Sequence, residues 1–361
     1  MGDDVYVKLR EFMNTLPAGY PSTPSGVEIR ILQKLYSPEE AELTMQLKNE
    51  PEEIPAIATR LGLDEAELAR RLEKMAHKGL IFRVRKENKA LYQAIQFMVG
   101  VYEFQLKNLD KEFCQMFEEY LPHFGRSLMP VKTKQLRVVP VESAVKSTPM
   151  VETYNRVREL VKGQKTFSVA QCICRKEQEI LGKKCDRPQE TCLGFGDLAQ
   201  FFIDNNLGRA IGKVEALKIL DLAEESGLVL SPSNSQELAA LCCCCPCCCP
   251  VLKYAKLMPR PADMVISYYQ AKIEPEICSS CGLCLDRCQI AAIKKGEDSY
   301  QVIDGRCIGC GLCVSACPTE AISMLTKFGM EPPPKVFLQD TLPKIKAERH
   351  AIQSKAKAGV S

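Results

Sequence analysis

The chain has 361 residues, 46% hydrophobic and 26% charged, which is enough to bury the cores of two or three modest domains. This composition excludes disorder and collagen-like repeats as overall descriptions. A net charge of +3 gives no strong attraction to nucleic acid or membranes, and only three histidines argue against a histidine-built metal centre.

Twenty residues are cysteine, and nineteen of them lie between Cys172 and Cys317. Such a density indicates either disulfides or bound metal. The first residues lack the apolar stretch of a secretory signal, and no apolar run is long enough to cross a membrane. We therefore expect a cytoplasmic protein whose thiols stay reduced and bind metal. Cys114, which stands alone, is expected to be an ordinary buried thiol.

Residues 27–95 show short helical patterns followed by two strands. A helix is expected over 27–36, and Ser37-Pro38-Glu39-Glu40 is typical of a capping box that opens a second. A third helix is expected from Pro51 to Gly62, and Asp64 is expected to cap a fourth over 64–78. Strands are predicted over 80–84 and 90–94, around a turn at 86–89. This succession is typical of a winged helix.

Residues 96–125 form a long amphipathic pattern rich in aromatic residues, which predicts a helix that packs in the core or in a homodimer interface. An extended connector is expected over 126–150. Further helices are expected over 151–163 and near 198–206 and 214–226. After residue 326 the chain is polar and basic, and we expect a loosely ordered tail that could aid contact with a partner.

The strongest motif is a repeat in which three cysteines, each separated by two residues, precede a fourth. Its members are Cys278, Cys281, Cys284 and Cys288, then Cys307, Cys310, Cys313 and Cys317, with Pro318 after the last. Three cysteines at this spacing surround one face of a four-iron cube, and in bacterial two-cluster ferredoxins the fourth ligates the other cluster. Gly282, Gly309 and Gly311 would let the backbone wrap closely. A zinc knuckle or disulfide knot is disfavoured because both halves match.

This pattern predicts two 4Fe-4S clusters with reciprocal ligands. One is expected on Cys278, Cys281, Cys284 and Cys317, and the other on Cys307, Cys310, Cys313 and Cys288. The overall expectation is an α+β protein in four segments. Residues 1–125 form a winged-helix-like and helical docking domain, 126–270 a cysteine-rich domain, 271–326 a two-cluster ferredoxin domain, and 327–361 the basic tail.

A second group of cysteines comprises Cys172, Cys174, Cys185 and Cys192, with Arg175 beside the first pair. Four thiolates could hold a third iron–sulfur cluster, which we favour, or a structural zinc ion. The C-x-C spacing is tight for one cube, so one of these thiols could be spare.

A third group is a polycysteine block that contains Cys242, Cys243, Cys244, Cys245, Cys247, Cys248 and Cys249. Neighbouring cysteines point in different directions, so all seven cannot face one small cluster. Some are expected to meet the second group, and together the eleven thiols suffice for one or two more clusters. The block also has C-x-x-C spacing, but the βαβ context of thioredoxin-like chemistry is not apparent. No nucleotide, flavin or haem motif is present, so electrons are expected to pass through partner proteins.

Over residues 5–325 the chain resembles a family of iron–sulfur proteins of anaerobes, described as 4Fe-4S dicluster or ferredoxin-type proteins. The resemblance rests on Cys172-Ile-Cys174-Arg175, Cys185-Asp-Arg-Pro188, the block and the repeat. In this family the block usually reads C-N-C-C-x-C-C-C. Its matching thiols are Cys242, Cys244, Cys245, Cys247, Cys248 and Cys249, so Cys243 is extra. The resemblance implies electron transfer and identifies no substrate. The C-C-G pattern of heterodisulfide reductases is missing, so their non-cubane chemistry is not implied.

Three functions follow from these patterns. The favoured one is an electron-transfer protein, or a subunit of an oxidoreductase complex, with the winged helix as a docking module. The alternative is a redox-sensing transcription regulator, supported by a basic wing (Arg83, Arg85, Lys86 and Lys89). Against it, helix 64–78 carries as many acids as bases, whereas DNA-reading helices are more often clearly basic. The third is an enzyme with a reactive cluster in the polycysteine block, which no acid–base constellation accompanies.

Overall fold

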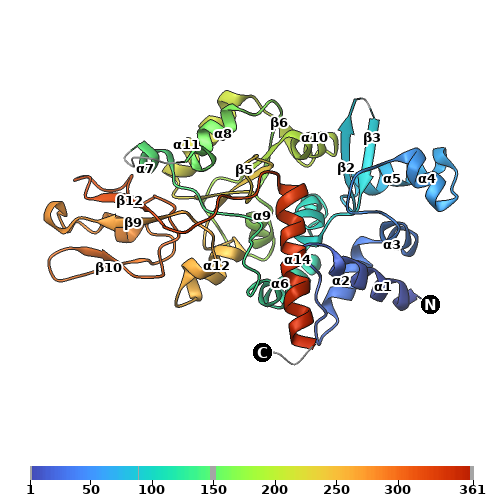
Figure 1. Ribbon diagram of the computed structural model, residues 1–361, viewed down its shortest axis with the longest axis horizontal. Coiled ribbons are helices and arrows are strands. Elements are labelled where there is room, and N and C mark those ends of the chain that lie inside the picture. The colour runs from blue at the N-terminus through green and yellow to red at the C-terminus, as the bar shows by residue number, and fades with distance from the viewer. Residues whose placement is uncertain (1, 88, 147–151, 358–361) are drawn as a thin grey trace.

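The computed structural model describes residues 2–87, 89–146 and 152–357 (Figure 1). The N-terminal part lies at one end of the molecule and the cysteine repeat at the other. The N-terminal elements are α1 (Gly2–Thr15), α2 (Val27–Leu35), α3 (Pro38–Met45), β1 (Glu52–Glu53), α4 (Ile54–Leu61), α5 (Glu65–His77), β2 (Phe82–Lys86) and β3 (Lys89–Gln93). The three strands pair antiparallel in the order β1–β3–β2. The expected helices and the strand hairpin of residues 27–95 are therefore present.

Capping residues lie at helix ends where the sequence predicts them. Ser37 and Glu40 form a reciprocal capping box at the start of α3. At the start of α5, the carboxylate of Asp64 accepts a hydrogen bond of 2.8 Å from the backbone N–H of Glu67. Gly62 ends α4 in the left-handed region, with φ of 65°.

The helix predicted over residues 96–125 is wrong in its first half. Short turns occupy Phe97–Val101 and Glu103–Gln105, and helix α6 (Lys111–Leu128) begins only after Asp110. Two local side-chain contacts explain the difference: the Asp110 carboxylate caps the N–H of Phe113, and the Glu103 carboxylate binds the N–H of Gly100. The aromatic side chains of this segment are nevertheless buried in the core, as one of the two expected roles requires.

The middle of the chain folds around a five-stranded antiparallel sheet that the sequence does not predict. Its strands, in the order β6–β4–β5–β8–β7, are β4 (Phe167–Gln171), β5 (Glu190–Phe195), β6 (Arg209–Ala210), β7 (Val229–Pro232) and β8 (Ala240–Cys244). The helices here are α7 (Glu142–Lys146), α8 (Val157–Lys162), α9 (Ile173–Ile180), α10 (Gly196–Asp204) and α11 (Lys213–Glu225). Helices α10 and α11 agree with the two predicted ones.

The segments on either side of residues 147–151 agree with prediction in part. The connector is extended through Val138 and Val139, whose N–H groups bind the carbonyls of Ile266 and Leu230, and it then forms α7. Residues 147–151, which include the start of the helix predicted over 151–163, lie outside the described residues. The rest of that prediction corresponds to a short turn at Thr153–Asn155 and to α8.

The cysteine repeat folds as two antiparallel strand pairs. The C-terminal elements are α12 (Pro250–Leu257), β9 (Tyr269–Ile273), α13 (Leu283–Arg287), β10 (Ile293–Lys295), β11 (Tyr300–Val302), β12 (Ile322–Thr326) and α14 (Leu342–Lys357), with short turns at Pro261–Asp263, Pro275–Ile277 and Phe337–Thr341. Strand β9 pairs with β12, and β10 pairs with β11. The middle sheet and these strands share one buried apolar cluster.

The expectation of a loosely ordered tail after residue 326 is wrong for α14. This helix returns to the N-terminal part, where it lies beside α6 (Figure 1). The Arg349 side chain, only 4% exposed, donates hydrogen bonds to the carbonyls of Leu16 and Pro17. The guanidinium therefore satisfies carbonyls that follow the end of α1. Within the described part of the chain, no helix has the length and apolar character needed to span a bilayer.

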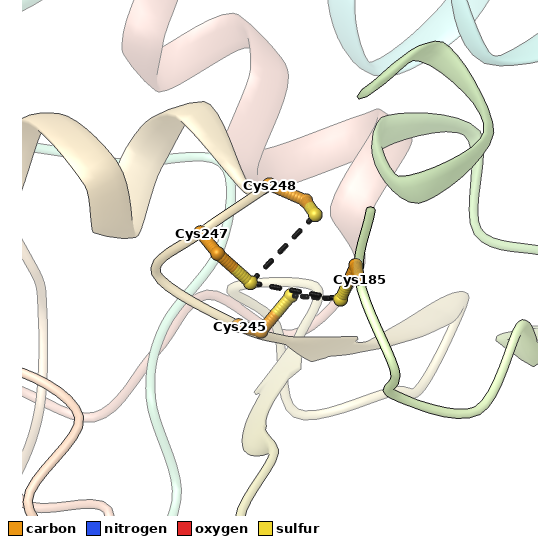
Figure 2. A group of neighbouring side chains, drawn as sticks. All are labelled: Cys185, Cys245, Cys247 and Cys248. Carbon is orange, nitrogen blue, oxygen red and sulfur yellow. Dashed lines mark hydrogen bonds between the residues drawn. The ribbon is translucent and has the colours of Figure 1, made fainter. Parts of the chain in front are cut away.

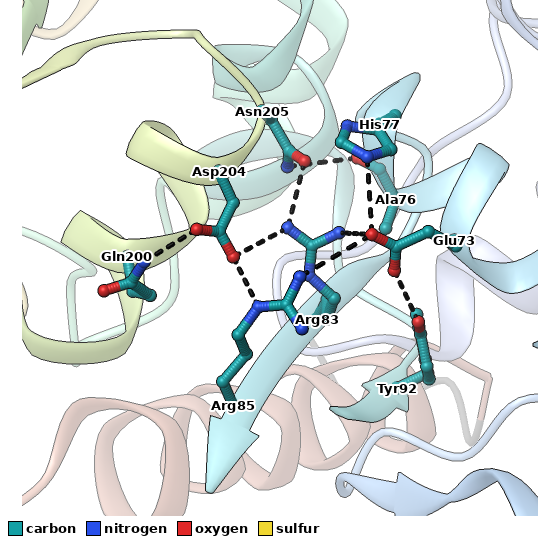
Figure 3. A network of polar contacts seen from close by, with 9 residues as sticks. All are labelled: Glu73, Ala76, His77, Arg83, Arg85, Tyr92, Gln200, Asp204 and Asn205. Carbon is teal, nitrogen blue, oxygen red and sulfur yellow. Dashed lines mark hydrogen bonds and ion pairs between the residues drawn. The ribbon is translucent and has the colours of Figure 1, made fainter. Parts of the chain in front are cut away.

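A buried ion network joins the strand hairpin to the middle of the chain (Figure 3). The side chain of Arg83 is fully buried, and it donates to Glu73 at 2.5 Å, to Asp204 at 3.1 Å and to Asn205 at 3.2 Å. Arg85, which is 45% exposed, donates to the same Asp204 carboxylate. Since Asp204 and Asn205 lie at the end of α10, these contacts fix the hairpin against the middle sheet.

We expect Arg83→Ala to lower the free energy of unfolding by about 3–5 kcal/mol, because it leaves partly buried carboxylates without their cation. The matched change Arg85→Ala removes a more exposed guanidinium and should cost less than about 1 kcal/mol. Urea denaturation followed by circular dichroism measures both. Equal effects of the two substitutions would contradict a structural role for the buried arginine.

Candidate metal centres

Two cavities lie within the cysteine repeat, and four cysteines line each of them. Cys278, Cys281, Cys284 and Cys317 line one cavity, and Cys288, Cys307, Cys310 and Cys313 line the other. These are the two reciprocal sets that the spacing predicts, with the fourth cysteine of each supplied by the other half of the repeat. The structure thus brings together the residues expected to share a cluster. That a 4Fe-4S cluster binds to each set remains a prediction.

Backbone amides face the sulfur atoms of these cavities. The N–H of Ala271, on β9, lies 3.3 Å from Cys307 Sγ, and the N–H of Ala292 lies 3.2 Å from Cys288 Sγ. Hydrogen bonds from the backbone to thiolate sulfur stabilise its negative charge and tune the reduction potential of an iron–sulfur cluster. The donors expected around such clusters are therefore in place.

The two cysteine sets differ in their access to solvent. Cys281 in the first set is exposed, whereas in the second set Cys310 is only partly accessible and Cys313 is buried. Burial raises the pKa of Cys310 to about 12. Cys284 and Cys313 are both buried, and the charge of Cys284 contributes to raising the pKa of Cys313, after the larger effect of burial. We call Cys278, Cys281, Cys284 and Cys317 the outer set, and Cys288, Cys307, Cys310 and Cys313 the inner set.

Glycine is required where the inner set packs on the middle of the chain. Gly311 has φ of 73°, and a Cβ atom there would lie 2.4 Å from the Cβ of Ala144. A Cβ atom at Gly309 would lie 2.2 Å from the carbonyl oxygen of Tyr269. Both contacts are far closer than atoms can approach. The ligand loop is therefore seated directly against α7 and β9.

The upstream cysteines meet around strands β5 and β8. Antiparallel pairing sets Cys192 of β5 opposite Cys242 of β8. Side-chain alternation along β8 then gives Cys242 and Cys244 a common face, opposite to that of Cys243. Hydrogen bonds between thiols link Cys192 to Cys242, Cys242 to Cys244, Cys244 to Cys249, and Cys172 to Cys174. The two series are neighbours, because the charges of Cys249 and Cys244 contribute to raising the pKa of Cys174, after its hydrogen bond with Cys172 and burial. We call Cys172, Cys174, Cys192, Cys242, Cys244 and Cys249 the six-thiol group.

The remaining upstream thiols, except Cys243, form a separate four-thiol group of Cys185, Cys245, Cys247 and Cys248 (Figure 2). All four Sγ atoms lie within 4.8 Å of one another. A turn after β8, closed by a 2.9 Å hydrogen bond from the N–H of Cys249 to the carbonyl of Cys245, lets three cysteines of the block converge. The fourth, Cys185, comes from the loop between α9 and β5.

This division differs from the grouping expected from sequence. Cys172, Cys174, Cys185 and Cys192 were expected to form one site, but Cys185 joins the polycysteine turn instead. The reason is topological, because the loop that carries Cys185 reaches the turn after β8, whereas Cys192 is fixed by strand pairing to the face of Cys242. The expectation that the block meets the second group is confirmed.

Cys243 is a core residue. It is 2% exposed and packs in the apolar cluster of the middle sheet, and burial raises its pKa to about 12. Alternation along β8 places this cysteine on the face of the sheet opposite to Cys242 and Cys244. Cys114 is likewise buried in helix α6.

Arg175, at the start of α9, is a buried cation beside the thiols. It is 1% exposed, and it donates to the carbonyl of Cys243 at 3.1 Å, to Cys245 Sγ at 3.7 Å and to the hydroxyl of Thr191. Among the described residues, no carboxylate forms an ion pair with it. The pKa of Cys245 is lowered to about 4, first by the hydrogen bond from Cys248 and also by Arg175, although burial opposes the shift.

Comparison with known protein families identifies the type of domain that contains the cysteine repeat. Residues 271–324 match the family model of a 4Fe-4S dicluster domain. No curated protein and no solved structure matches the chain significantly. The match and the cysteine groups together support an iron–sulfur protein. Because the matched segment begins after the polycysteine block, the upstream thiols are interpreted from their geometry alone.

We expect Gly311→Ala to destabilise the protein by about 1–3 kcal/mol or more and to reduce its iron content, because the added methyl group overlaps Ala144. Gly329→Ala is the matched control, since Gly329 has φ of 75° but no atom within 4 Å of its added Cβ. Thermal melting and iron analysis of both variants provide the measurement. If Gly329→Ala loses as much iron as Gly311→Ala, backbone strain alone explains the loss, and the overlap with Ala144 does not.

Proposed function

We propose that this protein transfers single electrons to or from a partner oxidoreductase through two 4Fe-4S clusters. The observation that carries the proposal is the lining of two adjacent cavities by eight cysteines in reciprocal sets. The match of this segment to a 4Fe-4S dicluster domain supports it. Each such cluster exchanges one electron, and its protein environment sets the potential. Reduced thiols at this density are also consistent with a cytoplasmic location.

The difference in exposure suggests a direction for the electron path. Beside the exposed Cys281 of the outer set, Ile277 is 52% exposed and Leu283 is 48% exposed. Apolar side chains that stay exposed near a redox centre suit transient contact with a partner protein. The inner set packs against the middle of the chain instead. We therefore propose that the partner docks at the outer set and that the inner set leads inward.

The six-thiol group is the candidate for a third cluster. Its members are intermediate or buried, and their mutual contacts place enough sulfur ligands around one region for a four-iron cube with two to spare. Like-charged thiolates in such a buried cluster repel one another unless metal neutralises them. This group would extend the path beyond the inner set.

The N-terminal winged-helix-like part lies at the opposite end from the outer set, and it is proposed to dock the protein within an oxidoreductase complex without forming the surface where electrons enter. A transcription regulator would need its basic wing free for phosphate contacts. Three of the four hairpin cations are instead occupied within the chain: Arg83 and Arg85 bind Asp204, and Lys89 binds Glu53 at 3.0 Å. This observation favours the electron carrier over the regulator.

The test is to count irons and electrons in protein purified without oxygen. Wild type should contain at least about eight irons per chain and accept at least about two electrons from reduced methyl viologen. Cys284→Ala and Cys313→Ala should each remove one cluster, because each deletes one ligand of a different set. The double variant should retain about four irons, held by the six-thiol group.

Cys243→Ala is the matched control, because it removes a cysteine that belongs to neither group; it should keep the full iron content. Fewer than about six irons in wild type would refute the assignment of two clusters. Full electron uptake by the double variant would place the electron path elsewhere.

A further inference from the structure

The sulfur atoms of the four-thiol group lie too close together for a four-iron cube. Cys247 Sγ is 3.6 Å from Cys185 Sγ and 3.7 Å from Cys248 Sγ, and Cys185 Sγ is 4.0 Å from Cys245 Sγ. Four thiolates around one tetrahedral ion, at metal–sulfur distances of about 2.3 Å, are separated by about 3.8 Å. In a cube each thiolate binds a different iron, so the sulfur atoms must spread further apart. The spacing matches a site for one ion.

We infer that Cys185, Cys245, Cys247 and Cys248 bind a single zinc ion, separate from the iron–sulfur clusters. Tetrahedral coordination by four cysteines is typical of structural zinc sites, which keep no position open for substrate. Zinc also binds such ligands more tightly than ferrous iron does. This inference replaces the preference for a cluster at Cys185 and is independent of the proposed electron path.

Charge balance supports thiolates rather than thiols at this site. A guanidinium is charged at any physiological pH, and burying one without an anionic partner is costly. Arg175 is 1% exposed, and the nearest group in its contacts that can carry negative charge is Cys245 Sγ at 3.7 Å. Four thiolates around a divalent cation carry a net charge of −2. The buried arginine therefore offsets part of the charge of the loaded site.

The position of the site indicates what the ion does. Three ligands belong to the turn after β8, while Cys185 belongs to the loop between α9 and β5, sixty residues earlier in the chain. Zinc has no redox chemistry of its own, so its effect here is to tie the two segments together. The elements that adjoin these two segments carry members of the six-thiol group, namely Cys192 of β5, Cys244 of β8 and Cys249 at the start of α12. The ion would hold the walls of that neighbouring group in place.

The wild-type protein is tested first, so that misfolding of a variant cannot confuse the result. Protein purified without oxygen should contain one zinc ion per chain beside its iron, and zinc X-ray absorption should show four sulfur neighbours at about 2.3 Å. Iron in place of zinc, or nitrogen and oxygen neighbours around the zinc, would overturn the inference. The iron count tests the proposed function separately, since either metal can be present without the other.

The second test uses two cysteines of the same block. Cys247→Ala should abolish zinc binding and leave most of the iron, whereas Cys243→Ala should keep both metals. The ligand variant should also lose the blue-green absorption that Co²⁺ gives in a tetrahedral thiolate site after zinc is exchanged. Full zinc content in Cys247→Ala, or loss of a complete iron cluster with zinc retained, would overturn the assignment.

Discussion

The arrangement of the upstream thiols depends on the alternation of side chains along strand β8, held in register by its pairing with β5. Alternation gives Cys242 and Cys244 one face of the sheet and sends Cys243 into the apolar core on the other. Where the strand ends, a hydrogen-bonded turn interrupts the alternation and directs Cys245, Cys247 and Cys248 to a different centre. A run of one residue type thus supplies ligands for two candidate metal centres and a core side chain through backbone geometry alone.

A single buried cation lies close to both upstream centres. The guanidinium of Arg175 hydrogen-bonds Cys245 in the four-thiol group. It also lowers the pKa of Cys172 in the six-thiol group, which falls to about 7 mainly because of the hydrogen bond from Cys174. Electrostatic effects are strong where water is excluded, so the charge state of one centre influences the other through this residue. The two groups are distinct in ligands yet coupled in electrostatics.

Features that depend on neighbours in sequence could be predicted. The caps at Ser37 and Asp64 and the reciprocal sets of the repeat follow from spacing, and the structure brings those residues together. The middle sheet could not be predicted, because cysteine and glycine in its short strands hide the alternation of apolar and polar residues. The partner of Cys185 depends on how a loop lies against a turn sixty residues later, which no local pattern encodes.

The contact between Arg349 and the carbonyls after α1 can form only late in the synthesis of the chain. Every cysteine of the chain precedes residue 349, so a ribosome completes all of the metal ligands before it adds the arginine that binds the N-terminal part. The N-terminal part therefore reaches its final set of contacts only after the cysteine-rich segments have been made. Docking of α14 is accordingly a late event in folding. It requires that the chain between α1 and α14 has already folded so as to place α14 beside the N-terminal part.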